Sequence, residues 1–213
     1  MKKRPSRRRS SEAFQESFDR QLRQKPDPLM QAGLELFASR GYDDTRVADI
    51  AEACDIAVGS LYNRFPSKQA FFSALEQDLF RRATQNLDRF LAAADPRWSA
   101  RRLLEELVRY MLASSQRTAG YIRTVVSLRQ RGEHPSGAGE LYYRYRARRV
   151  HELLQARGVL GPGSAAARRV LLALNAVNTV GAATALLADD RADAKRDALV
   201  SELSEMLYTY FTG

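Results

Sequence analysis

The chain has 213 residues, 45% of them hydrophobic, which is enough apolar material for a folded core in one compact domain or two small ones. Lys and Arg number 34 against 25 Asp and Glu, so the formal net charge of +9 favours a polyanionic partner, either nucleic acid or an anionic membrane surface. The single cysteine excludes an intrachain disulfide, and one cysteine with two histidines makes no metal-ligand cluster.

Residues 1–27 form a distinct N-terminal arm, predicted to be largely disordered when free because its first ten residues are rich in charge and almost without apolar side chains. Phe14, Phe18 and Leu22 then recur every four residues, which predicts a short amphipathic helix over 11–24. The arm lacks the apolar stretch of a signal peptide, so we expect a cytoplasmic protein. The basic side chains at its start are Lys2, Lys3, Arg4, Arg7, Arg8 and Arg9.

The next segment predicts a helix-turn-helix. Asp27 and Pro28 suit the cap and first residue of a helix that ends before Gly41, and Thr45 is placed to cap the following helix. That second helix has one apolar face, and a third short helix buries Leu61 and Phe65 at i,i+4 spacing. In such a motif the last of these helices enters the major groove of DNA.

Helical spacing continues to the end of the chain. Ser67 and Ser99 are predicted helix caps, Asp95 with Pro96 ends the helix between them, and Gly120 precedes a further helix. We find no internal repeat and no convincing strand pattern, so the predicted fold class is all-α. The expected helices run over about 67–94, 100–116, 121–131, 140–156, 164–188 and 192–211.

The run from Val170 to Ala188 nearly reaches the length of a membrane span. It is mostly Ala and is interrupted by Asn and Thr, so we interpret it as a buried helix at a packed interface and expect no membrane partner.

Residues 29–75 contain a set of residues in a specific order and spacing: Leu34 to Phe37, Arg40 to Tyr42, Thr45, Val47 to Ala51, Gly59, Leu61, Tyr62, Phe65, Ser67 and Lys68. In this pattern the segment closely resembles the DNA-binding domain of TetR-family transcriptional regulators, over about 47 of the 213 residues. The resemblance implies an all-helical homodimer that binds an operator in double-stranded DNA, usually as a repressor released by a small ligand. It divides the chain into the arm (1–27), a helix-turn-helix domain (28–75) and a C-terminal helical domain for ligand binding and dimerisation (76–213).

Roles at the DNA follow from the resemblance and from side-chain chemistry. Tyr62 and Lys68 match family positions that contact phosphate, and the Thr45 hydroxyl is a third candidate. Gly59 has no side chain and would let the helix approach DNA closely. Asn pairs with adenine, Arg with guanine, and Val contacts a thymine methyl. The candidate base-reading residues are therefore Arg46, Val58, Ser60, Asn63 and Arg64. For Arg64, a phosphate clamp or a surface ion pair is the alternative.

Two positions depart from the family pattern. The turn carries Asp55 where Gly is usual, and Asp tolerates left-handed geometry better than most residues. Ala57 stands where Ser or Thr usually caps the recognition helix, and a missing cap costs about 1 kcal/mol.

The charge distribution suggests a role for the arm. The segment 28–75 has four basic and six acidic residues, a net charge of −2, whereas 1–25 has nine basic and three acidic residues, a net charge of +6. Because phosphate neutralisation dominates duplex affinity, we expect the arm to supply much of that affinity, for example from the minor groove. The alternative is a solvated tail that aids solubility.

In the C-terminal domain the last two helices have apolar stripes, and in the family these helices form a four-helix dimer interface. Plain intrachain core is the alternative. The predicted interface residues are Ala173, Val177, Val180, Gly181, Leu199, Leu203, Met206, Leu207 and Tyr210. A ligand cavity is expected among residues 101–180, with candidates Tyr121, Arg123, Leu128, Tyr142, His151, Asn175 and Asn178, whereas the Arg144–Arg149 run is interpreted as a solvated face.

Other functions are weaker fits. No Gly-rich phosphate loop or Gly-x-Ser-x-Gly elbow occurs, so we expect no enzyme and no cofactor. A ligand-independent or architectural DNA-binding protein that relies on its basic arm remains open. A membrane-surface protein would use the arm and its Phe14/Phe18/Leu22 face.

Overall fold

The computed structural model describes residues 27–133, 137–187 and 192–213. These segments form nine helices and no strand, so the predicted all-α class is confirmed. The basic arm and its predicted helix over 11–24 lie outside the described residues. The helices are α2 (Pro28–Arg40), α3 (Val47–Ala53), α4 (Val58–Arg64), α5 (Lys68–Ala93), α6 (Ala100–Arg117), α7 (Ala119–Gln130), α8 (Ala138–Ala156), α9 (Ser164–Leu186) and α10 (Ala192–Thr212).

Side-chain caps fix the starts of three helices. Asp27 accepts a hydrogen bond from the Leu29 N–H at 3.0 Å, and Ser67 and Ser99 cap α5 and α6 in the same way. These three predictions are confirmed. The predicted cap at Thr45 is wrong, because the N-cap residue of α3 is Arg46 and the buried Thr45 hydroxyl points elsewhere.

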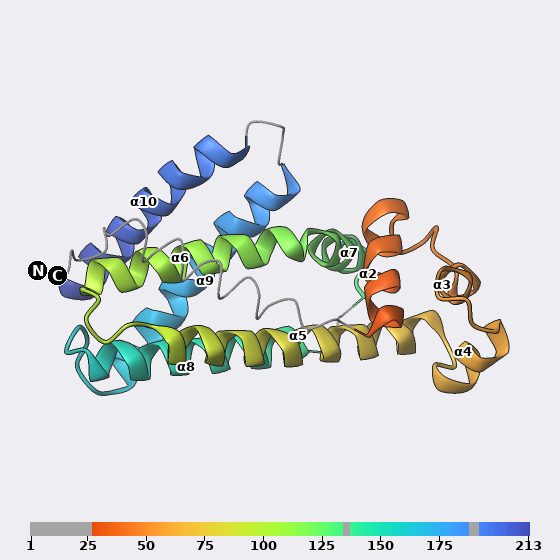
Figure 1. The fold of residues 1–213 in the computed structure, drawn as a ribbon, viewed down its shortest axis with the longest axis horizontal. Coiled ribbons are helices and arrows are strands. Elements are labelled where there is room, and N and C mark those ends of the chain that lie inside the picture. The colour runs from red at the N-terminus through yellow and green to blue at the C-terminus, as the bar shows by residue number, and fades with distance from the viewer. Residues whose placement is uncertain (1–26, 134–136, 188–191) are drawn as a thin grey trace, which may run out of the picture.

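The helix-turn-helix occupies one end of an elongated molecule (Figure 1). There α3 and α4 are outermost, and α2 stands between them and α7. Helix α5 runs from this end along α8, and the two are in extensive contact. Helices α9 and α10 both pack on α6, at the other end of the molecule from α4.

The core of the helix-turn-helix end does not stop at residue 75. One buried cluster contains Phe37 from α2 and Phe72 from α5, and it continues through Phe80 to Tyr121 of α7 and Tyr142 of α8. A second cluster fills the C-terminal half between α5, α6, α8, α9 and α10. Helix α5 contributes to both clusters, so it joins the two halves mechanically.

Helix α7 lies very close to α2 at Gly120. A Cβ atom built on Gly120 would overlap Ala38, with only 2.9 Å to the Ala38 Cα atom. The sequence pattern places Gly120 before a helix, but α7 begins at Ala119 and includes it. The glycine is needed for close approach of two helices rather than for a turn.

Helices α9 and α10 bury one face within their own chain. Gly181 faces Ser115 of α6, and the methyl group of an alanine there would lie 2.8 Å from the Ser115 hydroxyl oxygen. Five of the predicted interface residues are buried inside this chain, which corrects that prediction: Ala173, Val177, Gly181, Leu203 and Leu207. Their stripe packs on the chain's own helices, whereas Met206 and Tyr210 are exposed.

Helix α9 is the one helix in the described part of the chain that is long and apolar enough to cross a membrane. A third of its most apolar 18-residue stretch is buried inside the protein, and the core helices of soluble proteins can have the same length and apolar composition.

We expect Gly120→Ala to lower the free energy of unfolding by about 1–3 kcal/mol, because the added methyl group overpacks the α2–α7 contact. Chemical denaturation followed by circular dichroism would measure this. Gly59→Ala is the matched control: nothing lies within 4 Å of its Cβ position, and alanine favours a helix by about 0.5–1 kcal/mol. Equal effects of the two substitutions would contradict the prediction.

Candidate nucleic-acid interface and ligand cavity

The turn between α3 and α4 has the geometry that a helix-turn-helix requires. Asp55 adopts a left-handed conformation with φ 54°, as predicted, and the Ile56 N–H donates to the Ala51 carbonyl at 3.0 Å. Helix α4 follows with Ala57 as its N-cap residue and no side-chain cap, also as predicted. Its first N–H groups therefore have no side-chain acceptor.

Helix α4 presents nearly all of its side chains to solvent. Leu61 is its one buried residue, whereas Val58 is 41% and Tyr62 47% exposed. Ser60 and Asn63 are exposed as well, and no atom approaches the open side of Gly59. The structure thus brings the predicted residues Val58, Gly59, Ser60, Tyr62 and Asn63 onto one unobstructed short helix.

The two predicted arginines are already engaged. The Arg64 guanidinium lies 3.6 Å from the Asp27 carboxylate and 5.0 Å from the centre of the Phe65 ring, which is the surface ion pair considered as an alternative. Arg46 forms a capping box with Asp49: its backbone N–H donates to Asp49 Oδ2 at 2.7 Å and its Nη2 to Oδ1 at 2.8 Å. These hydrogen bonds hold the pKa of Asp49 below its usual range. Arg46 must give up part of this pairing to read a base.

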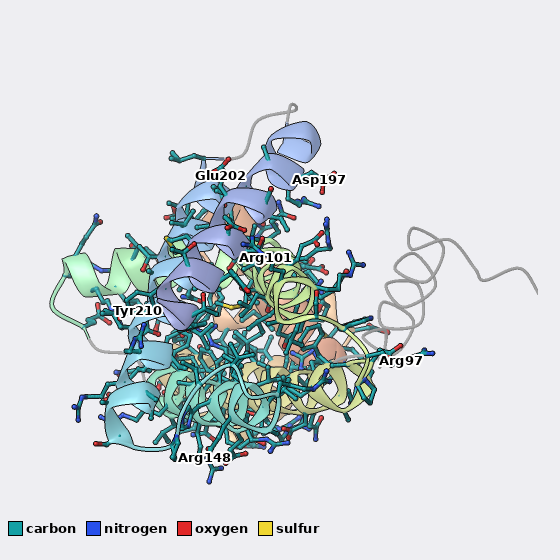
Figure 2. All side chains as sticks on the ribbon, turned by 90° about the vertical axis from the view of Figure 1, so that its left-hand side faces the viewer. Arg97, Arg101, Arg148, Asp197, Glu202 and Tyr210 are labelled. Atoms are coloured by element: carbon teal, nitrogen blue, oxygen red, sulfur yellow. The ribbon has the colours of Figure 1, made fainter. Side chains whose placement is uncertain are left out.

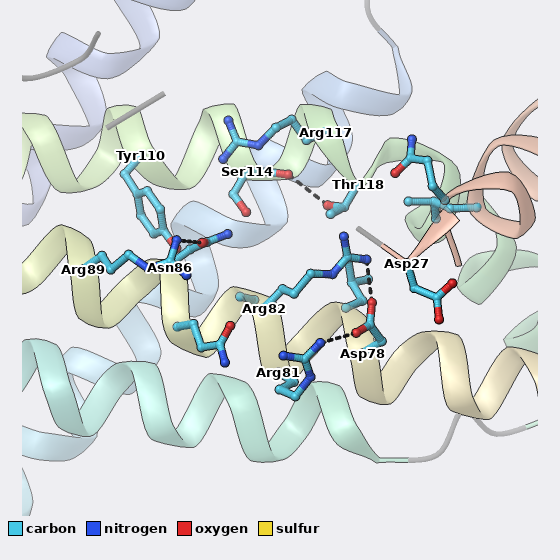
Figure 3. Close-up of a pocket in the computed structure, with 15 residues that line it drawn as sticks. Asp27, Asp78, Arg81, Arg82, Asn86, Arg89, Tyr110, Ser114, Arg117 and Thr118 are labelled. Atoms are coloured by element: carbon cyan, nitrogen blue, oxygen red, sulfur yellow. Dashed lines mark hydrogen bonds and ion pairs between the residues drawn. The ribbon is translucent and has the colours of Figure 1, made fainter. Parts of the chain in front are cut away.

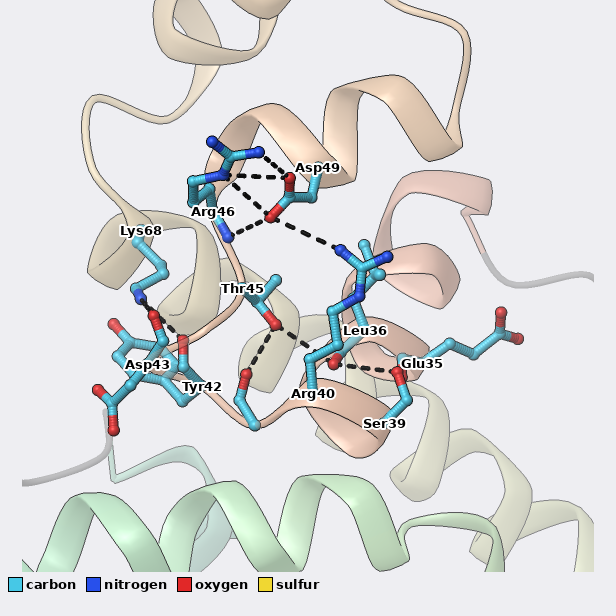
Figure 4. Close-up of polar contacts among 11 residues, drawn as sticks. Glu35, Leu36, Ser39, Arg40, Tyr42, Asp43, Thr45, Arg46, Asp49 and Lys68 are labelled. Atoms are coloured by element: carbon cyan, nitrogen blue, oxygen red, sulfur yellow. Dashed lines mark hydrogen bonds and ion pairs between the residues drawn. The ribbon is translucent and has the colours of Figure 1, made fainter.

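Thr45 and Lys68 tie the α2–α3 loop together (Figure 4). The Thr45 side chain is fully buried and donates to the Gly41 carbonyl at 2.7 Å, so its hydroxyl does not face an approaching phosphate. Lys68 Nζ donates to the carbonyls of Tyr42 at 2.7 Å and Asp43 at 3.1 Å. An ammonium has three N–H donors, so Lys68 keeps one for a phosphate oxygen.

A cleft of about 510 Å³ lies between α5, α6 and the start of α2 (Figure 3). Its described lining carries four arginines, Arg81, Arg82, Arg89 and Arg117, against Asp27 and Asp78, so the count of charges is +2. Asp78 bridges to the first two of these arginines. The cleft is open and cationic, and its volume suits a small organic ligand.

A smaller chamber of about 60 Å³ adjoins this cleft, with which it shares Tyr110, Ser114, Thr118 and two residues of α5. Its lining comes from α5, α6, α7, α8 and α9. It includes five aromatic residues, Phe80, Tyr110, Tyr121, Tyr142 and Tyr143, and its polar residues include Arg146 and Asn178.

The buried charge in this chamber is Arg146, whose side chain is 3% exposed. This corrects the interpretation of residues 144–149 as a solvated face at Arg146, whereas Arg144 and Arg148 are exposed. Arg146 lies one helical turn after Tyr142 and one before Val150, so it falls on the inward stripe of α8. This i,i+4 spacing is the sequence feature from which the burial of Arg146 could have been predicted. Transfer of a guanidinium from water to such a site costs several kcal/mol unless the charge is compensated.

Three of the predicted cavity residues meet in the chamber: Tyr121, Tyr142 and Asn178. The others lie elsewhere. Arg123 reaches the Ala38 carbonyl on α2, Leu128 is core, His151 lies 3.4 Å from the Gly161 carbonyl, and Asn175 is exposed. Asn175 and Asn178, three residues apart on α9, point about 60° from one another, so one faces solvent and the other the chamber. Within the described residues no group of three His, Cys, Asp or Glu could hold a metal ion.

Residues 29–75 match the family described as bacterial regulatory proteins, tetR family. The HTH-type transcriptional repressor KstR2 of Mycolicibacterium smegmatis is 41% identical over 66 residues, which is 29% of this chain and 32% of that protein. The matched segments span 19% to 32% of the length of the curated relatives.

Solved structures extend the likeness to the fold of most of the chain. A protein of Mesorhizobium loti described as a TetR-family transcriptional regulator superposes with a TM-score of 0.70 at 16% identity, over 90% of this chain and 96% of that one. The regulator FadR of Bacillus subtilis, in complex with stearoyl-CoA, superposes with a TM-score of 0.63 at 15% identity, over 86% of this chain and 97% of that one. The helix-turn-helix segment is thus similar to the TetR-family model, and most of the chain shares the fold of solved proteins described as TetR-family regulators.

Proposed function

We propose that this TetR-like chain is a sequence-specific, cytoplasmic DNA-binding regulator: a homodimeric repressor that leaves a palindromic operator when a small, partly apolar ligand binds. The observation that carries the proposal is the outward face of α4, where contact-forming side chains stand exposed on a helix that buries Leu61 alone. A solvent-exposed helix of this composition has the size and chemistry to enter a major groove.

On this proposal the roles divide by side-chain chemistry. Tyr62 and the free N–H of Lys68 bind phosphates, and Gly59 allows close approach of the backbone. Val58, Ser60 and Asn63 read base edges, with Arg46 and Arg64 joining them when they exchange their carboxylate partners for DNA. The Thr45 hydroxyl is left out of the set of DNA contacts because its one O–H is already directed at the backbone carbonyls of Gly41 and Leu36.

The proposed dimer uses the faces of α9 and α10 that do not pack on their own chain. Leu172 is 67% exposed on α9, and Ala176, Thr179 and Ala183 continue the same small, mostly apolar strip. Met206 and Tyr210 are exposed on α10, where Tyr210 marks the end of the helix in Figure 2. Two chains joined here would carry two α4 helices, as two half-sites about 34–36 Å apart require.

Ligand release is supported by the position of α7. Thr118, Tyr121 and Ile122 of this region line the chamber, while Gly120 packs against Ala38 of α2. The Tyr121 hydroxyl also donates to Glu76 of α5 at 2.7 Å. A ligand that displaces Tyr121 would therefore move α7 against α2 and shift the helix-turn-helix. The stearoyl-CoA complex of the Bacillus subtilis regulator supports a partly apolar ligand.

The second candidate is an architectural or ligand-independent DNA-binding protein. It is favoured by one observation, namely that residues 28–75 carry a net charge of −2 while residues 1–25 carry +6. In that case the arm, and not α4, would dominate binding.

Selection of binding sites from random duplex DNA tests the proposal. The unmodified protein should select a palindrome with two major-groove half-sites. Tyr62→Ala should weaken binding to every sequence, whereas Asn63→Ala should relax preference at one position of each half-site by about 1–3 kcal/mol. Sequence-blind binding by the unmodified protein would contradict the proposal and favour the architectural function. If both variants changed only overall affinity, the role assigned to Asn63 would be wrong.

For the arm, we expect a chain starting at Ser11 to bind the selected DNA more weakly. Its plot of log affinity against log salt should be shallower by about 0.9 for each phosphate that the missing residues would have neutralised. Fluorescence anisotropy across a salt series measures both quantities. Unchanged affinity and slope would show that the arm is a solvated tail.

For the dimer, Leu172→Glu should shift the mass in sedimentation from twice 24.0 kDa to a single chain, because a carboxylate would be buried in an apolar interface. Leu141→Glu is the control, since Leu141 is equally exposed (71%) but lies on α8. A monomeric unmodified protein, or a dimer that Leu172→Glu leaves intact, would contradict the proposed interface.

A further inference from the structure

Arg146 is a buried cation with no carboxylate partner in the part of the chain that the structure describes. The acidic side chains on and beside α8 are already paired with other arginines: Glu140 with Arg144, and Asp88 with Arg149. Glu152 likewise pairs with Arg149. A guanidinium that is 97% buried is ordinarily neutralised, so this one lacks its counter-charge.

Neutral groups hold Arg146 in place without cancelling its charge. Its Nη1 donates to Asn178 Oδ1 and its Nη2 to the Leu174 carbonyl, both at a long 3.3 Å, and its buried Nε has no acceptor. The guanidinium carbon lies 5.1 Å from the centre of the Tyr143 ring and 5.7 Å from that of Tyr142. The fork is therefore oriented, and donor capacity remains for a planar acceptor.

The walls around Arg146 suit an anionic group attached to an apolar body. Burial raises the pKa of Tyr110 and of Tyr142, so both phenols stay protonated and neutral. Phe80, Met111 and Ile122 supply apolar lining, and the chamber opens towards the wider cationic cleft. The cationic lining of the cleft would draw an anion inward.

Volume favours a carboxylate over a larger anion. A chamber of about 60 Å³ holds a small polar group rather than a whole organic ligand. A flat carboxylate fits this space and matches a guanidinium fork with two parallel hydrogen bonds. A tetrahedral phosphate ester is bulkier and carries more charge than one arginine compensates. The remainder of the ligand would extend into the cleft of about 510 Å³.

We propose that Arg146 anchors the carboxylate of the effector, which is an organic acid with an apolar body. The inference rests on the proposed function, because it names the ligand class of the same cavity. Bidentate pairing with Arg146 neutralises the buried charge in the chamber that Tyr121 and Ile122 of α7 line, and the body of the acid extends past Thr118, which lines both the chamber and the cleft. The same contact thus supplies affinity and reaches the helix that abuts α2.

Thermal shift and calorimetry on the DNA-free protein test the proposal with matched probes. The probes are butanoate, octanoate, decanoate, benzoate and phenylacetate, each compared with its own primary amide, which has nearly the same shape and no charge. At least one acid should bind about tenfold or more tightly than its amide, and Arg146→Met should abolish that preference. If no acid is preferred over its amide, or if Arg146→Met keeps the preference, the proposal is overturned.

Two further variants separate binding from folding. Arg148→Met is the matched control, because Arg148 is on the same helix but points away from the body of the protein (Figure 2), and it should bind the acid as the unmodified protein does. Arg146→Lys keeps a cation without the fork, so it should retain a weaker preference for the acid. Loss of acid binding in Arg148→Met, or loss of all preference in Arg146→Lys, would count against the anchor.

The unliganded variant gives an independent readout. Since Arg146→Met removes an uncompensated buried charge, its unfolding temperature without probe should equal or exceed that of the unmodified protein. A large decrease would show that the guanidinium serves the fold and would overturn the assignment. None of these measurements uses DNA, so their failure leaves the operator selection as a separate test of the proposed function.

Discussion

The helix-turn-helix end of this protein does not close its own core, and the rest of the structure depends on how α7 and α8 complete that core. Aromatic rings continue from Phe72 to Tyr121 at 6.1 Å between centroids, from Tyr121 to Phe80 at 5.6 Å and from Phe80 to Tyr142 at 5.5 Å. Each such pair contributes about 0.5–1.5 kcal/mol beyond the burial of its area. The helix-turn-helix is therefore positioned by side chains of α7 and α8, and any change in the chamber those rings line is also a change in its support.

Local chemistry made much of this fold predictable. Asp27, Ser67 and Ser99 stand where caps are needed, and Asp55 supplies the left-handed turn, so helix boundaries followed from neighbouring residues in the sequence. The outward face of α4 followed for the same reason, because the i,i+4 spacing of Leu61 and Phe65 defines its buried side and leaves the other side chains of this seven-residue helix exposed.

The incorrect predictions concern side chains whose burial depends on which other helix packs against them. Periodicity grouped the apolar side chains of α9 and α10 correctly but could not tell whether they meet their own chain or a second copy, and α6 proved to be the partner of Val177 and Leu207. Arg146 was misplaced because charge runs are usually solvated, and only the packing of α8 on α5 and α9 buries it. Thr45 fits a cap by sequence, but the Gly41 and Leu36 carbonyls lie within its reach. At each of these positions, the burial and hydrogen bonding of the side chain depend on contacts made in the folded chain rather than on local sequence preferences.

Leu61 is the one buried side chain of α4, and the helix lacks a side-chain cap. Exchanging Val58, Ser60 or Asn63 for other residues therefore removes almost no packing and breaks no cap. If α4 reads DNA as proposed, stability and target choice are encoded by different residues of the same helix. A lineage carrying this scaffold could change the promoter it recognises through successive point mutations, each of which leaves a folded protein for selection to act upon.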